Sequence, residues 1–219
     1  MSDLVLQEAR CRQPAADCPL CPRLAAFRAA NQAAFPGWHN APVPSFGGPD
    51  ARLLVVGLAP GLRGANCTGR PFTGDWAGDL LYATLLEFGL ARGSYGERAD
   101  DGLTLVNCRI TNAVRCVPPE NKPTPAEITG CNQFLKDEIA AMPNLKIVLA
   151  LGSVAHGAVL TALGKRKAAH PFTHGAVHHI GDELSLIDSY HCSRYNTNTR
   201  RLTTEMFRSV FIRIARLLA

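Results

Sequence analysis

A glycine-rich stretch from Gly57 to Asp75, GLAPGLRGANCTGRPFTGD, contains most of the residues that could do chemistry. It follows an apolar, β-branched run that is typical of a buried strand, and it precedes an amphipathic helix. Glycine lets a backbone approach a ligand closely, and the free amides at a helix N-terminus attract negative charge. The loop is therefore predicted to hold an anion, or a group that becomes one. Its spacing differs from that of dinucleotide-binding loops and P-loops, which disfavours a nucleotide cofactor.

Four cysteines form two pairs that could bind metal. Cys18 and Cys21 enclose two residues, whereas Cys116 and Cys131 enclose fourteen. Four thiolates in two pairs can close a tetrahedral zinc site or hold an iron-sulfur cluster, and the spacing does not separate these two. Ordinary buried thiols are the alternative. Among the other cysteines, Cys11 is the one competing ligand.

Two motifs resemble one known family. GLAPG followed by N-x-TGRPFTGD resembles the active-site motif of the uracil-DNA glycosylase superfamily, in particular its family 5 (type b) branch. The segment HCSRYNTNT, which begins at His191, resembles the H-x-S-x-x-N motif of the same family. The resemblance implies a monofunctional DNA repair enzyme that hydrolyses the N-glycosidic bond of uracil and leaves an abasic site. The family also accepts hypoxanthine and xanthine, and this chain is a candidate for the same breadth.

The resemblance also implies a cofactor. Families 4 and 5 carry a 4Fe-4S cluster on cysteines in this pattern, which here means Cys18, Cys21, Cys116 and Cys131. With all four thiolates on one cluster, no iron position stays open for substrate. The expected role is therefore structural: the cluster pins an N-terminal flap to the loop around residues 116–131.

The resemblance assigns catalysis to Asp75, His191 and Asn121. Cleavage of the bond passes through a sugar with oxocarbenium character and leaves a base with negative charge. Asp75 is expected to orient or deprotonate water, His191 to donate a hydrogen bond to a uracil oxygen, and Asn121 to help hold the water. Apolar Leu58 and Ala59 stand where other branches have a polar residue, which shifts the catalytic burden to Asp75. A helix-capping aspartate and a turn-forming asparagine are the simpler alternatives.

Substrate-binding residues are expected around the same loop. Phe72 is expected to stack on the extruded base, and Asn112 to pair with the Watson-Crick edge of uracil. A core phenylalanine and a turn asparagine are the alternatives. The full predicted set is Gly57, Ala59, Gly61, Phe72, Asn112 and His174.

A group of histidines near His174 has a spacing from which a metal site is conceivable. It comprises His170, His174, His178 and His179. Substrate-loop or surface roles are favoured, because the segment HPFTHGA is similar to family members that bind no metal there.

The residues that follow the His191 motif are expected to contact DNA by gripping phosphates or wedging the duplex beside the extruded base. They are Ser193, Arg194, Asn196, Arg200 and Arg201.

The elements that must position these residues alternate along the chain. Strands are predicted at residues 53–56, 103–108, 146–152 and 184–190, and helices at 24–35, 79–88, 124–142, 153–163 and around 207–217. Such alternation implies a parallel sheet covered on both faces, with the site at the carboxyl ends of the strands. The family implies a three-layer α/β/α sandwich with a central four-stranded parallel sheet. Residues 1–219 are expected to form one domain, with the N-terminal flap reaching to about residue 50.

The composition fits this interpretation. Hydrophobic residues make up 47% of the chain, and no apolar run reaches membrane-spanning length. The first ten residues have no long apolar segment and include the charged residues Asp3, Glu8 and Arg10. No signal peptide is therefore expected, and a cytoplasmic location follows. The net charge of +5 favours nucleic acid as a partner. A monomer acting on uracil-containing DNA, away from membranes, is expected.

Two other functions use the same features. A noncatalytic iron-sulfur protein that binds or senses DNA is the first, but binding alone does not need Asp75, Phe72 and His191 together. A zinc-stabilised hydrolase of nucleotides is the second, and it would be colourless where an iron-sulfur protein is brown.

Overall fold

The computed structural model describes residues 12–181 and 183–219. Cys11 lies outside the described residues. So do Asp3, Glu8 and Arg10, on which the prediction of a missing signal peptide rests. Among the helices of the described part, none is long and apolar enough to cross a membrane.

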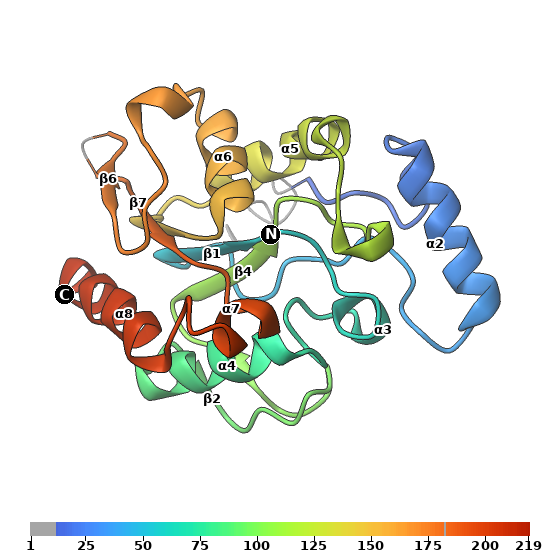
Figure 1. Cartoon of the computed structure of the whole chain (residues 1–219), viewed down its shortest axis with the longest axis horizontal. Coiled ribbons are helices and arrows are strands. Elements are labelled where there is room, and N and C mark those ends of the chain that lie inside the picture. Colours follow the sequence, from blue (N-terminus) through green and yellow to red (C-terminus); the bar gives the residue numbers. More distant parts are fainter. Residues whose placement is uncertain (1–11, 182) are drawn as a thin grey trace, which may run out of the picture.

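A five-stranded sheet forms the middle layer of the molecule (Figure 1). Four neighbouring strands run parallel, and the strand at one edge of the sheet pairs antiparallel with its neighbour. The predicted four parallel strands are therefore confirmed, but the antiparallel edge strand was not foreseen. The order across the sheet is β4 (Cys108–Asn112), β1 (Leu53–Gly57), β5 (Ile147–Leu151), β7 (Ser185–Ser189) and β6 (Val177–His179).

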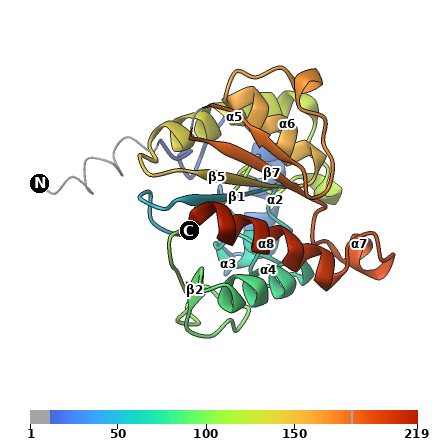
Figure 2. The ribbon, with the colours of Figure 1, turned by 90° about the vertical axis from the view of Figure 1, so that its left-hand side faces the viewer.

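Helices cover both faces of this sheet (Figure 2). On one face lie α5 (Pro125–Ala140) and α6 (Ser153–Ala162), and on the other α4 (Trp76–Glu87) and α8 (Thr204–Leu218). Successive side chains of β1 alternate between the two cores, because a strand turns every second residue to the same face. The three-layer sandwich is confirmed.

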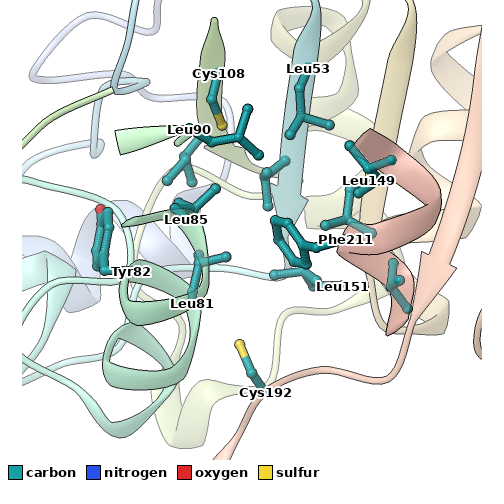
Figure 3. Packing of buried hydrophobic residues seen from close by; sticks show 14 of the residues in the cluster. Leu53, Leu81, Tyr82, Leu85, Leu90, Cys108, Leu149, Leu151, Cys192 and Phe211 are labelled. Atoms are coloured by element: carbon teal, nitrogen blue, oxygen red, sulfur yellow. The ribbon is translucent and has the colours of Figure 1, made fainter. Parts of the chain in front are cut away.

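The core between α4, α8 and the sheet is the larger of the two (Figure 3). Leu81 and Leu85 of α4 meet Phe211 of α8 and Leu53 of β1, all fully buried. Cys108 is buried in the same cluster. Burial of side chains of this size contributes about 1.5–3 kcal/mol each. The first turn of α4, which carries Asp75 at its cap, is thereby held firmly against the sheet.

The second strand was predicted about five residues too early. Residues 104 and 105 form β3 (Thr104–Leu105), which pairs with β2 (Ala91–Arg92) in a separate small sheet. The real strand, β4, contains Arg109, Thr111 and Asn112, all buried. Buried polar residues depend on tertiary partners, which no local pattern reveals.

The helices follow their start and stop signals closely. The predicted start of α5 is confirmed by a capping box, in which Thr124 and Glu127 each accept a hydrogen bond from the other's backbone amide. By contrast, α4 begins at Trp76 and not near Asp79, because the Asp75 carboxylate already caps it. The remaining helices are α2 (Pro22–Ala34), α3 (Ala65–Thr68), α7 (Arg194–Asn198) and the short 3₁₀ turns η1 (Pro119–Asn121) and η2 (Lys167–Ala169).

A buried ion-pair network joins β4 to α5. The Glu138 side chain has no exposed surface, and it accepts hydrogen bonds from Arg109 Nε at 2.7 Å and Arg115 Nη2 at 2.5 Å. Burial alone would raise the pKa of Glu138, but the two guanidinium groups outweigh it and hold the pKa below its ordinary value. The network fixes the loop that leads from β4 to Cys116.

Candidate active site and cysteine cavity

A cavity of about 570 Å³ opens at the carboxyl ends of the parallel strands. This is the position where open α/β sheets bind their ligands. Leu151 and Gly152 at the end of β5 form part of its wall, as does Tyr190 after β7. Nine of the residues predicted from sequence line it: Ala59, Gly61, Asp75, Asn121, His191, Ser193, Arg194, Asn196 and Arg201.

Asp75 has two roles in this structure. Its Oδ1 accepts hydrogen bonds from the amides of Ala77 at 3.1 Å and Gly78 at 3.2 Å, so it caps α4 as the simpler alternative predicted. It also lines the cavity. Burial raises the pKa of Asp75 above its ordinary value of 3.8, and the two amides offset this only in part. The result is a carboxylate held in fixed orientation with enhanced basicity.

The loop before Asp75 needs glycine at one position because the backbone runs so close to this carboxylate. A Cβ at Gly64 would lie 2.7 Å from Asp75 Oδ2. Glycine at this position thus leaves space for the Asp75 side chain. The sequence shows the glycine but not the carboxylate that requires it.

His191 follows β7 and lines the same cavity. Burial lowers the pKa of His191 to about 4, so the imidazole is neutral at physiological pH. Its backbone oxygen accepts a hydrogen bond from Asn196 Nδ2 at 2.8 Å, which fixes the turn between β7 and α7. A neutral ring can donate a hydrogen bond without adding a positive charge to the site.

A group of three residues lies next to His191. It consists of Phe72, Asn112 and Gly57. The Phe72 ring is stacked on the His191 ring with centroids 5.9 Å apart. Gly57 pairs with Asn112 across β1 and β4, and a Cβ on Gly57 would collide with Asn112 Oδ1 and the Phe72 ring. Both side chains are nearly buried, at 3% exposure for Asn112 and 5% for Phe72. The structure therefore brings three predicted substrate-binding residues together next to the cavity histidine, although none of the three belongs to the cavity lining.

Asn121 reaches the cavity from η1. It and Glu120 both have left-handed backbone conformations, with φ of 57° and 55°. Two consecutive residues in this region cost conformational free energy, of the order of 1 kcal/mol or more each. This strained turn carries an exposed asparagine to the wall of the cavity.

The residues after His191 form the rim of the cavity. Ser193 caps α7, and its Oγ accepts a hydrogen bond from the Asn196 amide. Arg194 lies over the Trp76 ring, and Arg201 over the Tyr190 ring. Arg200 is exposed and does not belong to the lining. Four of the five predicted DNA contacts therefore surround the opening.

His174 lies away from the cavity lining. Its Nδ1 accepts a hydrogen bond from the Tyr190 amide at 3.1 Å, and its ring is stacked on Tyr190. Burial lowers the pKa of His174, so it too favours the neutral form. In this position it supports a residue that lines the cavity.

A buried hydrogen-bond network joins two histidines to one aspartate. Asp188 in β7 contacts His156 Nδ1 at 2.7 Å and His178 Nε2 at 3.0 Å. The amide of Thr173 donates to the same carboxylate, and His156 Nε2 lies 2.8 Å from the backbone oxygen of His170. The network ties the segment between α6 and β6 to the sheet. Of the histidine group noted in the sequence, only the His178 side chain takes part. His156 was missed because it lies in α6, well before this group in the chain.

The four paired cysteines line a second, smaller cavity beside α2 and α5. Cys116 Sγ accepts a hydrogen bond from Arg28 Nη1, and Cys131 Sγ from the Arg115 amide, both at 3.4 Å. Burial raises the pKa of Cys131 to about 11, so this thiol ionises at neutral pH only when a cation binds it. The donor set, four sulfurs around one cavity of which two accept N–H hydrogen bonds, suits a metal group. Within the described part of the chain, no three of these four sulfurs lie within 4.8 Å of one another.

Several cavity residues gave no signal in the sequence. Trp76, Phe172 and Tyr190 line the cavity, yet none belongs to a metal-ligand or catalytic spacing. Trp76 directly follows Asp75 and is 49% exposed, which is unusual for tryptophan. Its position after the motif was the one available hint.

Comparison with known proteins agrees with this geometry. Residues 44–215 match the model of the uracil DNA glycosylase superfamily. A type-5 uracil-DNA glycosylase of Thermus thermophilus is 47% identical over 91% of this chain and 93% of its own length. One of Pyrobaculum aerophilum is 40% identical over 91% and 88%. A type-4 uracil-DNA glycosylase of Sulfurisphaera tokodaii is 31% identical over 77% and 72%. The motifs, the strand-end cavity and these relatives together establish that the chain belongs to the uracil-DNA glycosylase superfamily, in its family 5 branch.

Proposed function

We propose that this protein removes uracil from DNA by hydrolysing its N-glycosidic bond, which leaves an abasic site. The observation that carries the proposal is one cavity at the strand ends lined by both Asp75 and His191, a basic carboxylate and a neutral imidazole. The relatives named uracil-DNA glycosylases, which match most of the chain, support the same substrate. The reaction needs water on one side of the sugar and stabilisation of the departing base on the other.

Asp75 is the residue that positions and activates the water. Two backbone amides fix its Oδ1, which leaves Oδ2 to hold a water against C1′ of the deoxyribose. The water gives its proton to the carboxylate as the C1′–O bond forms and the C1′–N1 bond breaks. The negative charge of Asp75 also favours the positive character of the sugar in the transition state. Asn121, on the cavity wall, is proposed to hold the same water.

His191 acts on the leaving base. The electron pair of the broken bond stays on uracil, and its charge spreads to the ring oxygens. A neutral imidazole that donates a hydrogen bond to one of these oxygens stabilises the anion as it forms. The low pKa of His191 makes a hydrogen bond, and not full proton transfer from an imidazolium, the contribution of this residue.

Phe72 and Asn112 recognise the extruded base. The Phe72 ring, stacked on His191, offers an aromatic surface beside the site, and Asn112 can present both a donor and an acceptor to the edge of uracil. Gly57, Ala59 and Gly61 shape the loop around the base, and His174 acts through Tyr190. Hypoxanthine and xanthine are proposed as further substrates.

Ser193, Arg194, Asn196, Arg200 and Arg201 are proposed to hold the DNA backbone around the opening. Arginine side chains and the amides at a helix N-terminus are common phosphate contacts, and both occur at the start of α7. The protein is proposed to act as a single-domain monomer in the cytoplasm.

A 4Fe-4S cluster on Cys18, Cys21, Cys116 and Cys131 is proposed to join the N-terminal segment to α5. A zinc ion with Zn–S distances of about 2.3 Å would need sulfurs about 3.8 Å apart. No three sulfurs of the four described cysteines lie within 4.8 Å of one another, which supports the larger group. When bound, the cluster supplies a rigid link between distant segments. Arg28 and the Arg115 amide would hold the sulfurs in place.

A direct assay tests the proposed activity. Purified protein is incubated with an oligonucleotide that contains one uracil, and alkali then cleaves any abasic site. Cleavage is expected at the uracil and nowhere in a matched oligonucleotide with thymine. If neither oligonucleotide is cleaved but both bind the protein, the result would support a noncatalytic DNA-binding function instead.

Metal analysis tests the cluster. The purified protein is expected to be brown and to contain about four iron atoms per chain. Cys21→Ser should remove colour and lower stability together, because the site links distant segments. Cys67→Ser is the matched control, since Cys67 is also partly exposed but lies outside the cysteine cavity. One zinc and no iron would contradict the proposal.

A further inference from the structure

An exposed tryptophan forms the wall of the cavity next to Asp75. Trp76 is the first residue of α4, and 49% of its surface is exposed. Val154 and Tyr195 are also exposed, at 41% and 71%, and line the same cavity. Large exposed apolar side chains that gather at one opening mark binding surfaces.

The indole of Trp76 is held in a fixed orientation. Its Nε1 donates a hydrogen bond to Thr197 Oγ1 at 2.9 Å, although the two residues are 121 positions apart. The guanidinium carbon of Arg194 lies 5.5 Å from the ring centroid. Trp76 therefore spans the gap between α4 and α7. A ring that is already fixed loses little conformational entropy when a ligand binds it.

The surroundings of this ring indicate the chemistry of its ligand. A flat aromatic surface next to Arg194, in a cavity that Arg201 also lines, suits a flat ring that is attached to an anion. Nucleobases in a DNA strand have this combination, and proteins that bind single strands pair aromatic side chains with basic ones. Any base can stack, because every base has a π-face.

We propose that Trp76 forms a stacking subsite for the nucleobase next to the extruded nucleotide. The inference rests on the proposed function, since it takes DNA as the substrate. Trp76 directly follows Asp75 in the chain, so a base stacked on its ring fixes the strand beside the carboxylate. Trp76 is thus a binding residue, and it takes no part in bond cleavage.

Single-turnover excision assays with three oligonucleotides test the subsite. The first has a normal base on each side of uracil, and in the other two the 5′ or the 3′ neighbour is replaced by a tetrahydrofuran spacer without a base. Stacking contributes a factor of about 5 to 150 per base. Trp76→Ala should raise the half-saturating enzyme concentration by that factor on the normal oligonucleotide. On one spacer oligonucleotide it should have no effect, since the base that stacks is already missing.

Two matched variants separate stacking from a structural role. Trp76→Phe keeps an aromatic ring but loses the bond to Thr197, and it should retain most of the wild-type affinity. Thr197→Val keeps the indole but removes its acceptor, together with the hydrogen bonds from Thr197 Oγ1 to the backbone oxygens of Ser193 and Arg194, and it should behave in the same way. Equal losses by Trp76→Ala on all three oligonucleotides, or losses in Trp76→Phe and Thr197→Val as large as in Trp76→Ala, would overturn the proposal.

Fluorescence keeps this test independent of the excision reaction. The chain has two tryptophans, so Trp38→Phe leaves Trp76 as the single emitter. Phenylalanine at 38 can keep the ring stacked on Phe35. The normal oligonucleotide should quench the emission of Trp76, whereas one spacer oligonucleotide should bind without quenching. If the protein excises nothing, the proposed function fails while this quenching still supports or contradicts the subsite.

Discussion

Glu138 and Asp75 lie in two regions that treat a carboxylate in opposite ways. Glu138, between β4 and α5, is completely buried and is paired with both Arg109 and Arg115. Asp75, at the cavity, is partly exposed and accepts hydrogen bonds from the backbone amides of Ala77 and Gly78. The guanidinium groups lower the pKa of Glu138, whereas burial raises that of Asp75.

The difference shows how one chain separates stability from chemistry. A carboxylate neutralised by two cations has little tendency to take a proton, so Glu138 holds the fold. A carboxylate stabilised only by backbone amides stays basic, and Asp75 can accept a proton from water. The chain places the second kind where the cavity admits a ligand. Four changes test this contrast, from the largest expected effect to the smallest.

Asp75→Asn should slow uracil excision by about 10²- to 10⁴-fold, because it removes the proposed general base. Asparagine also caps helices well, so α4 and the unfolding free energy should change little. Single-turnover rates and DNA affinity are the measurements, and the affinity should stay near that of the wild type. A wild-type rate in this variant would show that the base is another residue, with Asn121 or Asn112 the next candidates.

Glu138→Gln should lower the unfolding free energy by about 3–5 kcal/mol, because it leaves the buried Arg109 and Arg115 without their anion. Urea denaturation measures this, and the excision rate of the folded protein should stay near normal. The matched control is Glu183→Gln, which breaks an exposed pair with Lys146 and should leave stability almost unchanged. If Glu138→Gln lost activity without losing stability, the contrast between the two regions would be wrong.

The pH profile should show Asp75 on its acid limb. A base works only when ionised, so excision should fall as the pH drops through the pKa of Asp75. Burial raises that pKa, which places the limb above 3.8, the ordinary value of an aspartate. In Asp75→Asn the residual rate should lack this limb. A wild-type profile that stays flat down to pH 3.8 would contradict the raised basicity.

Arg201→Ala should reduce the slope of log affinity against log salt by about 0.9, since it removes one proposed phosphate contact. The Arg201 side chain lines the cavity and lies over the Tyr190 ring. It has no part in the ion-pair network of Glu138. Arg216→Ala, in the last turn of α8 and outside the cavity lining, is the control and should leave the slope unchanged. Equal slopes for Arg201→Ala and the wild type would place the DNA elsewhere.

The sequence alone determined the elements with strong local signals. The capping box at Thr124 fixed the start of α5, and the apolar runs of β1 and β5 identified buried strands. The spacing of the cysteines and the ordered motif from Gly57 to Asp75 indicated which residues could bind a metal group or take part in a reaction. These features depend on near neighbours in the chain, which is why they can be recognised without a fold.

Only the tertiary structure decided how these residues act. β4 was misplaced because its polar residues depend on partners such as Glu138, and His156 was missed because Asp188 reaches it through space. The hydrogen bond from Trp76 to Thr197 joins residues that are 121 positions apart in the chain. The pKa of Asp75 depends on burial, which is a property of the packed chain. A sequence shows which groups are present, whereas their protonation and partners follow from the surroundings that folding creates.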